Sequence, residues 1–260
     1  MKVVLFCGGL GTRLREHSDT IPKPLVNIGV RPIIWHLMRY YAHYGHKDFV
    51  LCLGYRGDLI KEFFLNYNEC LSNDFVFENG GRSVRPLRSD IEDWRITFAD
   101  TGMHANIGER LWAVRPYLEK ESEFLANYSD GLTDLPLDEY LSNCRKQDCV
   151  GNFVASRTAQ SFHAVHTAES GIVTSLGRVS DTEFWINAGF FLFKTKIFDY
   201  MQPGEELVEQ PFQRLIDDKQ LYAYKYQGFW QPMDTFKEKI AFDRMYARNH
   251  APWQVWRDPK

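Results

Sequence analysis

Residues 3–13 read Val3-Val4-Leu5-Phe6-Cys7-Gly8-Gly9-Leu10-Gly11-Thr12-Arg13, an apolar run that ends in three glycines within four positions. A short run of apolar residues without polar alternation is typical of a strand in a parallel sheet that is covered on both faces. Glycines let the backbone turn sharply and approach a ligand, and their N–H groups can bind phosphate oxygens. Arg13 and Lys23, which is held in Pro22-Lys23-Pro24, add positive charge. The stretch therefore predicts a buried strand followed by a phosphate-binding loop, rather than a glycine turn with incidental surface cations.

Two better-known glycine-rich loops do not fit this stretch. A P-loop requires Gly-x-x-x-x-Gly-Lys-Ser/Thr, and no lysine followed by serine or threonine comes after Gly11. A dinucleotide-binding loop opens a helix and is followed by an acidic residue about 20 positions on. Here the loop contains Arg13 and runs on to Pro22 and Pro24. Both motifs are therefore excluded.

Length and charge limit the classes of function. The chain has 260 residues and a net charge of −3, so it is long enough for one large domain and lacks a basic footprint for nucleic acid. We expect a single domain over residues 1–260, with a nucleotide-binding half (1–150) and a second half (151–260). Its apolar stretches are too short for a membrane span, and residues 1–5 lead into a strand rather than a signal peptide.

The five cysteines are odd in number and scattered along the sequence. Cys144 and Cys149 lie too far apart for a Cys-x-x-Cys pair. We therefore expect free thiols and a cytoplasmic location, not a disulfide framework or a zinc site.

Strands and helices alternate along the first half. The pattern predicts strands at residues 2–7, 49–53 and 124–127, helices at 32–44 and 59–67, and a hairpin that pairs residues 75–77 with 94–98. In the second half it predicts strands at 152–156, 163–167, 171–176, 183–194 and 222–226, and a final helix at 235–248. Such alternation predicts an α/β fold with a mainly parallel sheet flanked by helices, whose strand ends bind the ligand.

Two tryptophans lie in the tail, at Trp253 and Trp256. A terminal segment is usually poorly ordered unless something holds it in place. The tail therefore either docks on its own domain or anchors a contact between subunits.

Aspartates mark the expected ligand edge of the sheet. Asp130 follows the predicted strand at 124–127 and precedes a glycine, which places its carboxylate beside the glycine loop. Asp234 precedes the final helix, and its position alone favours a helix N-cap. Asp134 is interpreted as the cap of a helix that starts near Pro136.

The chain resembles the nucleotidyltransferases that activate sugar phosphates, and within them the glucose-1-phosphate cytidylyltransferases. The resemblance covers nearly the whole chain and rests on the glycine loop, on Pro22-Lys23-Pro24, and on further segments in order. These are Lys47-Asp48-Phe49, Gly54-Tyr55-Arg56-Gly57, Asp100-Thr101-Gly102, Gly108-Glu109-Arg110-Leu111, Tyr128-Ser129-Asp130-Gly131, Asn187-Ala188-Gly189-Phe190-Phe191 and Gly228-Phe229-Trp230-Gln231-Pro232-Met233-Asp234-Thr235.

The resemblance implies a Rossmann-like mixed, mainly parallel sheet whose β-rich second half forms the acceptor pocket. It implies transfer of CMP from CTP to a sugar 1-phosphate, with release of pyrophosphate, in a homo-oligomer. Arg13 and Lys23 would be catalytic, and Mg²⁺ would bind at Asp130 and Asp234, which reverses the preference for a cap at Asp234. The nucleotide-binding residues it implies are Gly8, Gly9, Leu10, Gly11, Thr12, Arg13, Lys23, Arg110 and Ser129. UTP and dTTP remain the competing donors.

The acceptor region departs from the family pattern. Members of the family carry Glu-Lys-Pro shortly before Asn-Gly-Gly-Phe-Phe, whereas this chain reads Leu176-Gly177-Arg178 and then Asn187-Ala188-Gly189. Ser129 also replaces a glycine beside Asp130. The acceptor-binding residues expected here are Arg178, Trp185, Asn187, Ala188 and Gly189. The acceptor is therefore glucose 1-phosphate, another sugar phosphate, or a non-sugar phosphate or phosphonate.

Two other classes compete with a cytidylyltransferase. A glycosyltransferase with a related sheet uses Asp-x-Asp after a core strand, but this chain has Ser129-Asp130-Gly131, and Lys23 would have no role. A silent nucleotide-binding homologue would be expected to lack Lys23 or one of the metal aspartates, and all of them are present.

Overall fold

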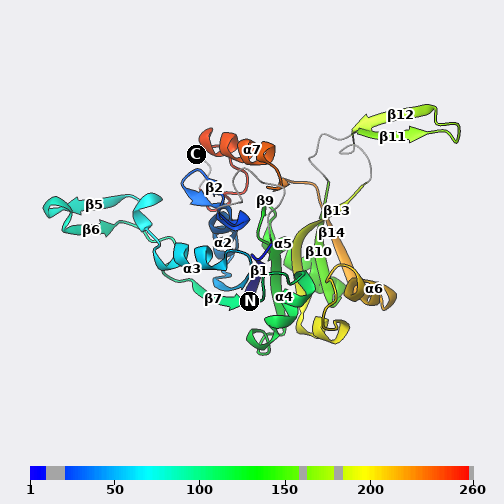
Figure 1. The fold of residues 1–260 in the computed structure, drawn as a ribbon, viewed down its shortest axis with the longest axis horizontal. Helices are drawn as coiled ribbons and strands as arrows, with labels where there is room; N and C mark the ends of the chain where they lie inside the picture. The colour runs from blue at the N-terminus through cyan, green and yellow to red at the C-terminus, as the bar shows by residue number, and fades with distance from the viewer. Residues whose placement is uncertain (10–20, 158–162, 179–183, 258–260) are drawn as a thin grey trace.

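A seven-stranded mixed sheet forms the centre of the molecule (Figure 1). The computed structural model describes residues 1–9, 21–157, 163–178 and 184–257. The strand order is β14-β10-β13-β8-β1-β4-β7, and β13 runs antiparallel to both of its neighbours while the other pairs are parallel. The strands are β1 (Lys2–Phe6), β4 (Asp48–Leu53), β7 (Arg95–Asp100), β8 (Glu123–Tyr128), β10 (Gly151–Ser156), β13 (Ile186–Lys194) and β14 (Leu221–Tyr226). The α/β architecture expected from the alternating pattern is confirmed.

Helices cover both faces of this sheet. They are α2 (Ile33–His43), α3 (Gly57–Leu65), α4 (Ile107–Ala113), α5 (Leu137–Gln147), α6 (Gln210–Asp217) and α7 (Phe236–Ala247). Successive residues of β1 enter different cores, since Val3 and Leu5 belong to one buried cluster and Val4 and Phe6 to the other. This alternation is the two-residue period of a strand that is buried on both faces. Short 3-10 turns lie at Lys23–Leu25 (η2), Glu69–Leu71, Asn79–Gly81, Arg115–Tyr117 and Thr195–Tyr200.

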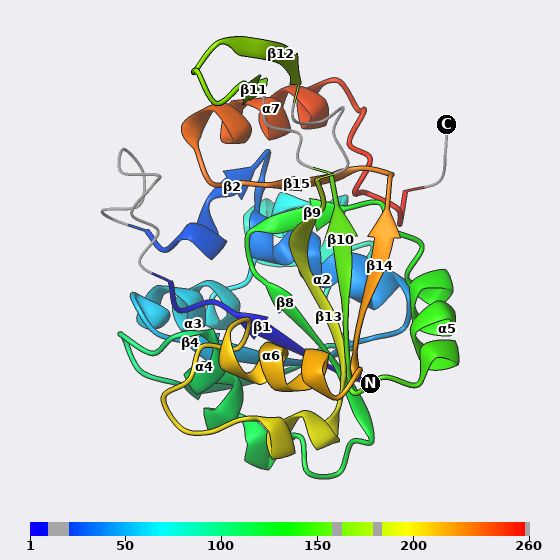
Figure 2. The same ribbon diagram turned by 90° about the vertical axis from the view of Figure 1, so that its right-hand side faces the viewer.

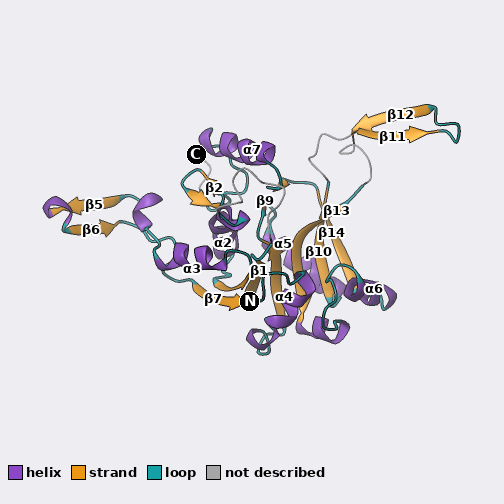
Figure 3. Ribbon diagram, viewed as in Figure 1, coloured by secondary structure: helices purple, strands orange, loops and turns teal. Residues whose placement is uncertain are grey.

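Four small two-stranded sheets complete the fold. Near the body lie β2 (Asn27–Ile28) with β3 (Arg31–Pro32), and β9 (Gly131–Thr133) with β15 (Trp230–Pro232). Two hairpins project away from the body (Figure 3): β5 (Phe75–Glu78) with β6 (Ser83–Pro86), and β11 (His163–Thr167) with β12 (Val173–Arg178).

The expected hairpin between residues 75–77 and 94–98 is wrong. Phe75 pairs with Pro86 inside the β5–β6 hairpin, whereas β7 pairs in parallel with β4 and forms an edge of the central sheet. Both segments are apolar strands, but β7 finds its partner in a strand that comes earlier in the chain. The polar connection between the two segments supplies β6.

The C-terminal tail docks on its own domain. Trp253 is fully buried against Phe229 and Phe242, and its indole N–H points to His36 Nδ1 at 3.3 Å. Trp256 packs edge-on against Trp35 of α2. Of the two interpretations of the tail, the contact within the domain is the one observed.

All five cysteines lie in the described part of the chain and are free thiols. Within the described ranges, no helix combines the length and apolar character that a membrane span requires.

Candidate active site

The β9–β15 pair brings the two candidate metal aspartates together. Gly131 of β9 lies opposite Pro232 of β15, and the Met233 amide donates to the Asp130 carbonyl at 2.8 Å. Asp130 directly precedes β9, and Asp234 follows β15 after one residue. Asp130 and Asp234 are about a hundred residues apart in the sequence, and this short antiparallel pair brings them together at the carboxyl end of β8.

Lys23 lies between these two carboxylates. Its Nζ donates to Asp130 Oδ2 at 2.5 Å and to Asp234 Oδ1 at 2.6 Å. Pro22 precedes the 3-10 turn η2 in an extended conformation and Pro24 is buried within it, so the backbone on either side of Lys23 is restricted. Burial opposes the charged form of Lys23, but the neighbouring Asp130 and Asp234 outweigh it and raise the pKa of the ammonium above its ordinary value.

Asp234 is not the cap of the final helix. Thr235 is the N-cap of α7 and forms a capping box with Glu238. The Glu238 carboxylate also accepts a hydrogen bond from the Asp234 amide at 2.7 Å. The backbone of Asp234 is thereby fixed, and its carboxylate is directed at Lys23.

Asp134 does not cap the helix that follows it either. The N-cap of α5 is Pro136, which makes no side-chain cap. Asp134 Oδ1 instead accepts a hydrogen bond from the Tyr226 hydroxyl at 2.5 Å. The earlier interpretation of Asp134 as a cap is therefore wrong: its carboxylate links the segment after β9 to β14.

Asp130 and Asp234 form a donor set that fits Mg²⁺. Both carboxylates reach one Lys23 nitrogen, so they lie close enough to share a small cation. Mg²⁺ is usually held by one or two carboxylates, with substrate phosphates and waters completing its octahedron. Within the described residues, no group of three or more His, Cys, Asp or Glu side chains could hold a metal by itself. The site therefore suits a cation that shares its coordination with phosphates, not an all-protein cage.

The glycine loop starts at this same edge of the sheet. Gly8 and Gly9 follow β1, whereas Leu10, Gly11, Thr12 and Arg13 lie outside the described residues. Ser129 is buried and donates to the Phe6 carbonyl at 2.8 Å, which fixes the end of β8 against the end of β1. The described part of the loop therefore lies on the strand next to the one that leads to Asp130.

Arg110 is a buried hub behind this loop. Its guanidinium is 3% exposed, which excludes a surface arginine. It donates to the carbonyls of Gly8 (3.0 Å), Leu53 (3.1 Å) and Gly102 (2.9 Å), and to the Thr101 hydroxyl (2.8 Å). It thus ties together the carboxyl ends of β1, β4 and β7. A role for Arg110 in contacting the nucleobase stays a prediction.

Two glycines make room for that guanidinium. A Cβ at Gly8 would lie 2.1 Å from Arg110 Nη1, and one at Gly54 would lie 2.7 Å from the same atom. Sequence reasoning did not predict that Thr101 and Gly102 would accept hydrogen bonds from Arg110. The sequence feature that could have indicated this arrangement is the presence of Gly8 and Gly54 after two core strands, together with Arg110.

Three of the predicted acceptor residues, Asn187, Ala188 and Gly189, lie on β13, next to β8. Asn187 Oδ1 accepts from the Gly189 amide at 2.8 Å, and the Trp230 indole donates to the Ala188 carbonyl at 3.0 Å. Gly189 has φ +75°, and a Cβ there would lie 2.2 Å from the Tyr128 ring, so this position requires glycine. β13 therefore brings residues 187–189 to the edge of the sheet that carries Asp130.

The two other acceptor candidates lie in different places. Arg178 ends β12, in the projecting hairpin, and faces His163 of β11 in the strand register. Trp185 directly precedes β13, and its ring lies 5.3 Å from both Arg157 and Lys225. The structure thus gathers Lys23, Asp130, Asp234, Gly8, Asn187 and Trp185 at one edge of the sheet, and it places the backbone of Arg178 on a separate hairpin.

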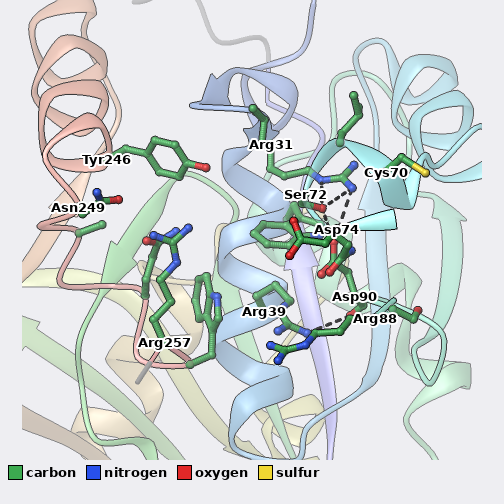
Figure 4. A pocket seen from close by; sticks show the side chains of 18 of the residues that line it. Arg31, Arg39, Cys70, Ser72, Asp74, Arg88, Asp90, Tyr246, Asn249 and Arg257 are labelled. Atoms are coloured by element: carbon green, nitrogen blue, oxygen red, sulfur yellow. Dashed lines mark hydrogen bonds and ion pairs between the residues drawn. The ribbon is translucent and has the colours of Figure 1, made fainter. Parts of the chain in front are cut away.

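A large cavity lies away from this edge (Figure 4). It encloses about 1690 Å³ between α2, the base of the β5–β6 hairpin and the C-terminal tail, and its lining does not include Lys23, Asp130 or Asp234. Its charged groups are partly paired with one another, since Arg31 donates to the Ser72 hydroxyl at 2.5 Å and lies 3.6 Å from Asp90. These contacts anchor the base of the hairpin to β3, directly before α2.

Comparisons with known proteins agree with this geometry. The sequence profile of the family described as "Nucleotidyl transferase" matches residues 2–258. The "Probable glucose-1-phosphate cytidylyltransferase" of Bacillus subtilis (strain 168) is 34% identical over 258 residues, which cover 98% of this chain and 100% of that protein. The "Glucose-1-phosphate cytidylyltransferase" of Salmonella typhimurium is 34% identical over 261 residues, with the same coverage.

Solved structures share the fold. A UDP-glucose pyrophosphorylase complexed with UDP-glucose superposes with a TM-score of 0.70 at 17% identity, over 95% of this chain and 98% of that one. HddC from Yersinia pseudotuberculosis gives a TM-score of 0.65 at 18% identity, over 94% of this chain and 99% of that one. At these identities the likeness establishes the fold alone.

Proposed function

The chain belongs to the nucleotidyl transferase family, and from that premise we propose that it is a cytidylyltransferase. It transfers CMP from CTP to the phosphate of a sugar 1-phosphate and releases pyrophosphate. The two 34%-identical relatives named for this reaction support the choice of CTP and of a sugar 1-phosphate acceptor. The observation that carries the proposal is the convergence of Lys23, Asp130 and Asp234 at the carboxyl edge of the sheet.

The reaction needs no general base. A phosphate monoester is largely dianionic at neutral pH, because its second pKa is about 6. One of its oxygens attacks the α-phosphorus of CTP and forms the new O–P bond. The bond from the α-phosphorus to the bridging oxygen breaks, and pyrophosphate leaves with that electron pair. Catalysis therefore consists of positioning two anions and neutralising the charge that develops between them.

Each side chain has a distinct part in this scheme. Arg13 and the loop residues Gly8 to Thr12 hold the departing phosphates, and Lys23 contacts the acceptor phosphate and the α-phosphate. Asp130 and Asp234 would hold Mg²⁺, which when bound neutralises phosphate charge. Ser129 and Arg110 keep the ends of β8 and β1 in place around the nucleotide.

Residues 185–189 bind the body of the acceptor. Asn187 presents an amide beside the reactive edge, and Ala188 and Gly189 fix the turn of the strand there. Arg178 contacts the acceptor from the β12 end.

Pyrophosphate release tests the proposal. The four ribonucleoside triphosphates and dTTP are crossed with glucose 1-phosphate and a panel of other phosphates, in the presence of Mg²⁺. We expect release that requires both CTP and an acceptor. Release with UTP or dTTP only would mean that this nucleotide, and not CTP, is the donor. No release with any pair would refute the proposal.

A further inference from the structure

A row of side chains crosses the acceptor half of the sheet on one face. In the strand register, Ala155 of β10 lies opposite Asn187 of β13 and also opposite Lys225 of β14. Residues that lie directly opposite each other point to the same face, and so do residues two positions apart. Trp185 directly precedes β13 and Arg157 directly follows β10, and the Trp185 ring lies against both Arg157 and Lys225.

This row starts at the reactive edge. The pairing of β8 with β13 ends at Phe190–Asn127, so the first residues of β13 lie at the carboxyl end of β8, where Asp130 follows. Neighbouring strands lie about 4.8 Å apart. Figure 2 shows β10 and β14 pointing toward the end of the sheet where β15 and α7 lie. The row thus lies at the end of the sheet that carries Asp130, with Asn187 on β13 beside β8 and with Lys225 on β14, at the edge of the sheet.

Two cations gather at the far end of the row. The Arg157 guanidinium and the Lys225 ammonium each lie 5.3 Å from the centre of the Trp185 ring. Both side chains are exposed, whereas Trp185 is half-buried. Within the described ranges, neither cation forms an ion pair with a carboxylate. Two like charges therefore lie at one aromatic ring, and no carboxylate of the described residues pairs with either of them.

The alternative to a binding site is a pair of surface cations that stack on an aromatic ring, a contact worth about 0.5–1 kcal/mol at exposed sites. Three features favour a site. Lys225 shares a face with Asn187, Ala155 between them has a short side chain, and the row begins one strand away from the reactive aspartates.

We propose that Arg157, Lys225 and Trp185 form an anion subsite, and that the acceptor carries a second phosphate or a carboxylate remote from the phosphate that reacts. This inference rests on the proposed function for the placement of the reacting phosphate. Trp185 contacts the apolar face of the acceptor, and the two cations bind its second anionic group. A sugar 1-phosphate whose sugar carries no charge would offer no counterion to Arg157 and Lys225.

Calorimetric titration tests the subsite directly. Glucose 1-phosphate, glucose 1,6-bisphosphate and glucuronic acid 1-phosphate are titrated into the protein with Mg²⁺ and α,β-methylene-CTP. We expect one of the doubly anionic compounds to bind about tenfold more tightly than glucose 1-phosphate, on the scale of charge-assisted hydrogen bonds. The bisphosphate identifies a phosphate and the glucuronate a carboxylate. The preference should disappear in Arg157→Gln/Lys225→Gln and persist in the control Lys61→Gln, an exposed lysine of α3.

Equal affinity for all three compounds, or a preference that survives in the double variant, would overturn the subsite. Pyrophosphate release with CTP separates this result from a failure of the proposed function. If glucose 1-phosphate turns over while no binding preference exists, the result supports the proposed function and refutes the subsite. If the preference exists but no acceptor supports release, the subsite stands and the proposed reaction falls.

Discussion

At the scale of single residues, Lys23 connects the parts of the site. It is the one side chain that contacts both Asp130 and Asp234 among the contacts described. Its position between two prolines restricts the backbone around it, so the ammonium is held in place before substrates arrive. Such preorganised charge is worth more in a partly dry site than in water.

Replacing Lys23 by alanine should lower kcat by about 10²-fold or more, the scale for loss of one preorganised electrostatic donor. Initial rates of pyrophosphate release measure the effect. Lys47→Ala is the matched control, because Lys47 is a surface lysine paired with Asp93 far from the site. Near-normal turnover in Lys23→Ala would contradict the assigned role.

Gly8 and Gly9 should respond differently to a methyl group. An alanine at Gly8 overlaps the Arg110 guanidinium, whereas one at Gly9 meets no atom of the described residues within 4 Å. Gly8→Ala should therefore lower the free energy of unfolding by about 2 kcal/mol, because buried carbonyls lose their donor. Gly9→Ala should leave that free energy unchanged. Thermal unfolding of both variants provides the test, and equal stability would show that Arg110 does not depend on the space at Gly8.

The sequence predicted the convergence of Lys23, Asp130 and Asp234 better than the residues that support them. Lys23, Asp130 and Asp234 stand in restrictive local motifs, and the structure brings them together. The sequence did not predict that Arg110 holds three strand ends together. Most of its partners are backbone carbonyls, which every type of residue supplies. Asp134 was misassigned because its partner, Tyr226, lies 92 positions away.

At the scale of elements, two adjacent residues at the start of α7 have different partners, and we expect different roles for them. Thr235 caps the helix, while Asp234 presents its carboxylate to Lys23. Adjacent residues with distinct partners allow the two roles to be tested independently.

Thr235→Ala should cost about 1 kcal/mol of stability, the usual value for loss of an N-cap. Asp234→Asn should instead lower kcat by at least tenfold, because the amide lacks the negative charge that pairs with Lys23 and suits a metal. Chemical denaturation and pyrophosphate release, measured on both variants, give the comparison. Unchanged kcat in Asp234→Asn would contradict the role of its carboxylate, and unchanged stability in Thr235→Ala would contradict the cap at Thr235.

Most elements followed from periodicity, but the partner of β7 did not. Apolar strands at 75–77 and 94–98 suggested a hairpin, since neighbours in sequence often pair. The register of β7 is set by β4 in the core, which the local pattern around residues 94–98 does not contain. The periodicity thus predicted the strands, but the order of the strands in the sheet is determined by tertiary packing.

At the scale of the whole molecule, apolar surface is concentrated on the two projecting hairpins. Phe77 of β5 is 63% exposed and Leu176 of β12 is 65% exposed, and Phe75, Val84, Val165 and Val173 are exposed on the same hairpins. A two-stranded hairpin is only marginally stable by itself in water. We propose that these hairpins bind other copies of the chain and so form the homo-oligomer that the resemblance implies.

Light scattering after gel filtration should show an oligomer for the unmodified protein. Phe77→Glu places a charge on the apolar face of the β5–β6 hairpin and should yield a smaller species. Leu65→Glu, at an 82% exposed position of α3, should change nothing. A monomeric unmodified protein would contradict the oligomer.

The fate of labelled phosphate tests the central claim most directly. The protein is incubated with Mg²⁺, acceptor and CTP labelled at either the α- or the γ-phosphorus. Nucleotidyl transfer predicts that the α-label appears in the acceptor product and the γ-label in pyrophosphate, and that Lys23→Ala slows both in parallel. Transfer of the γ-label to the acceptor, or release of the α-label as free CMP without a joined product, would contradict it.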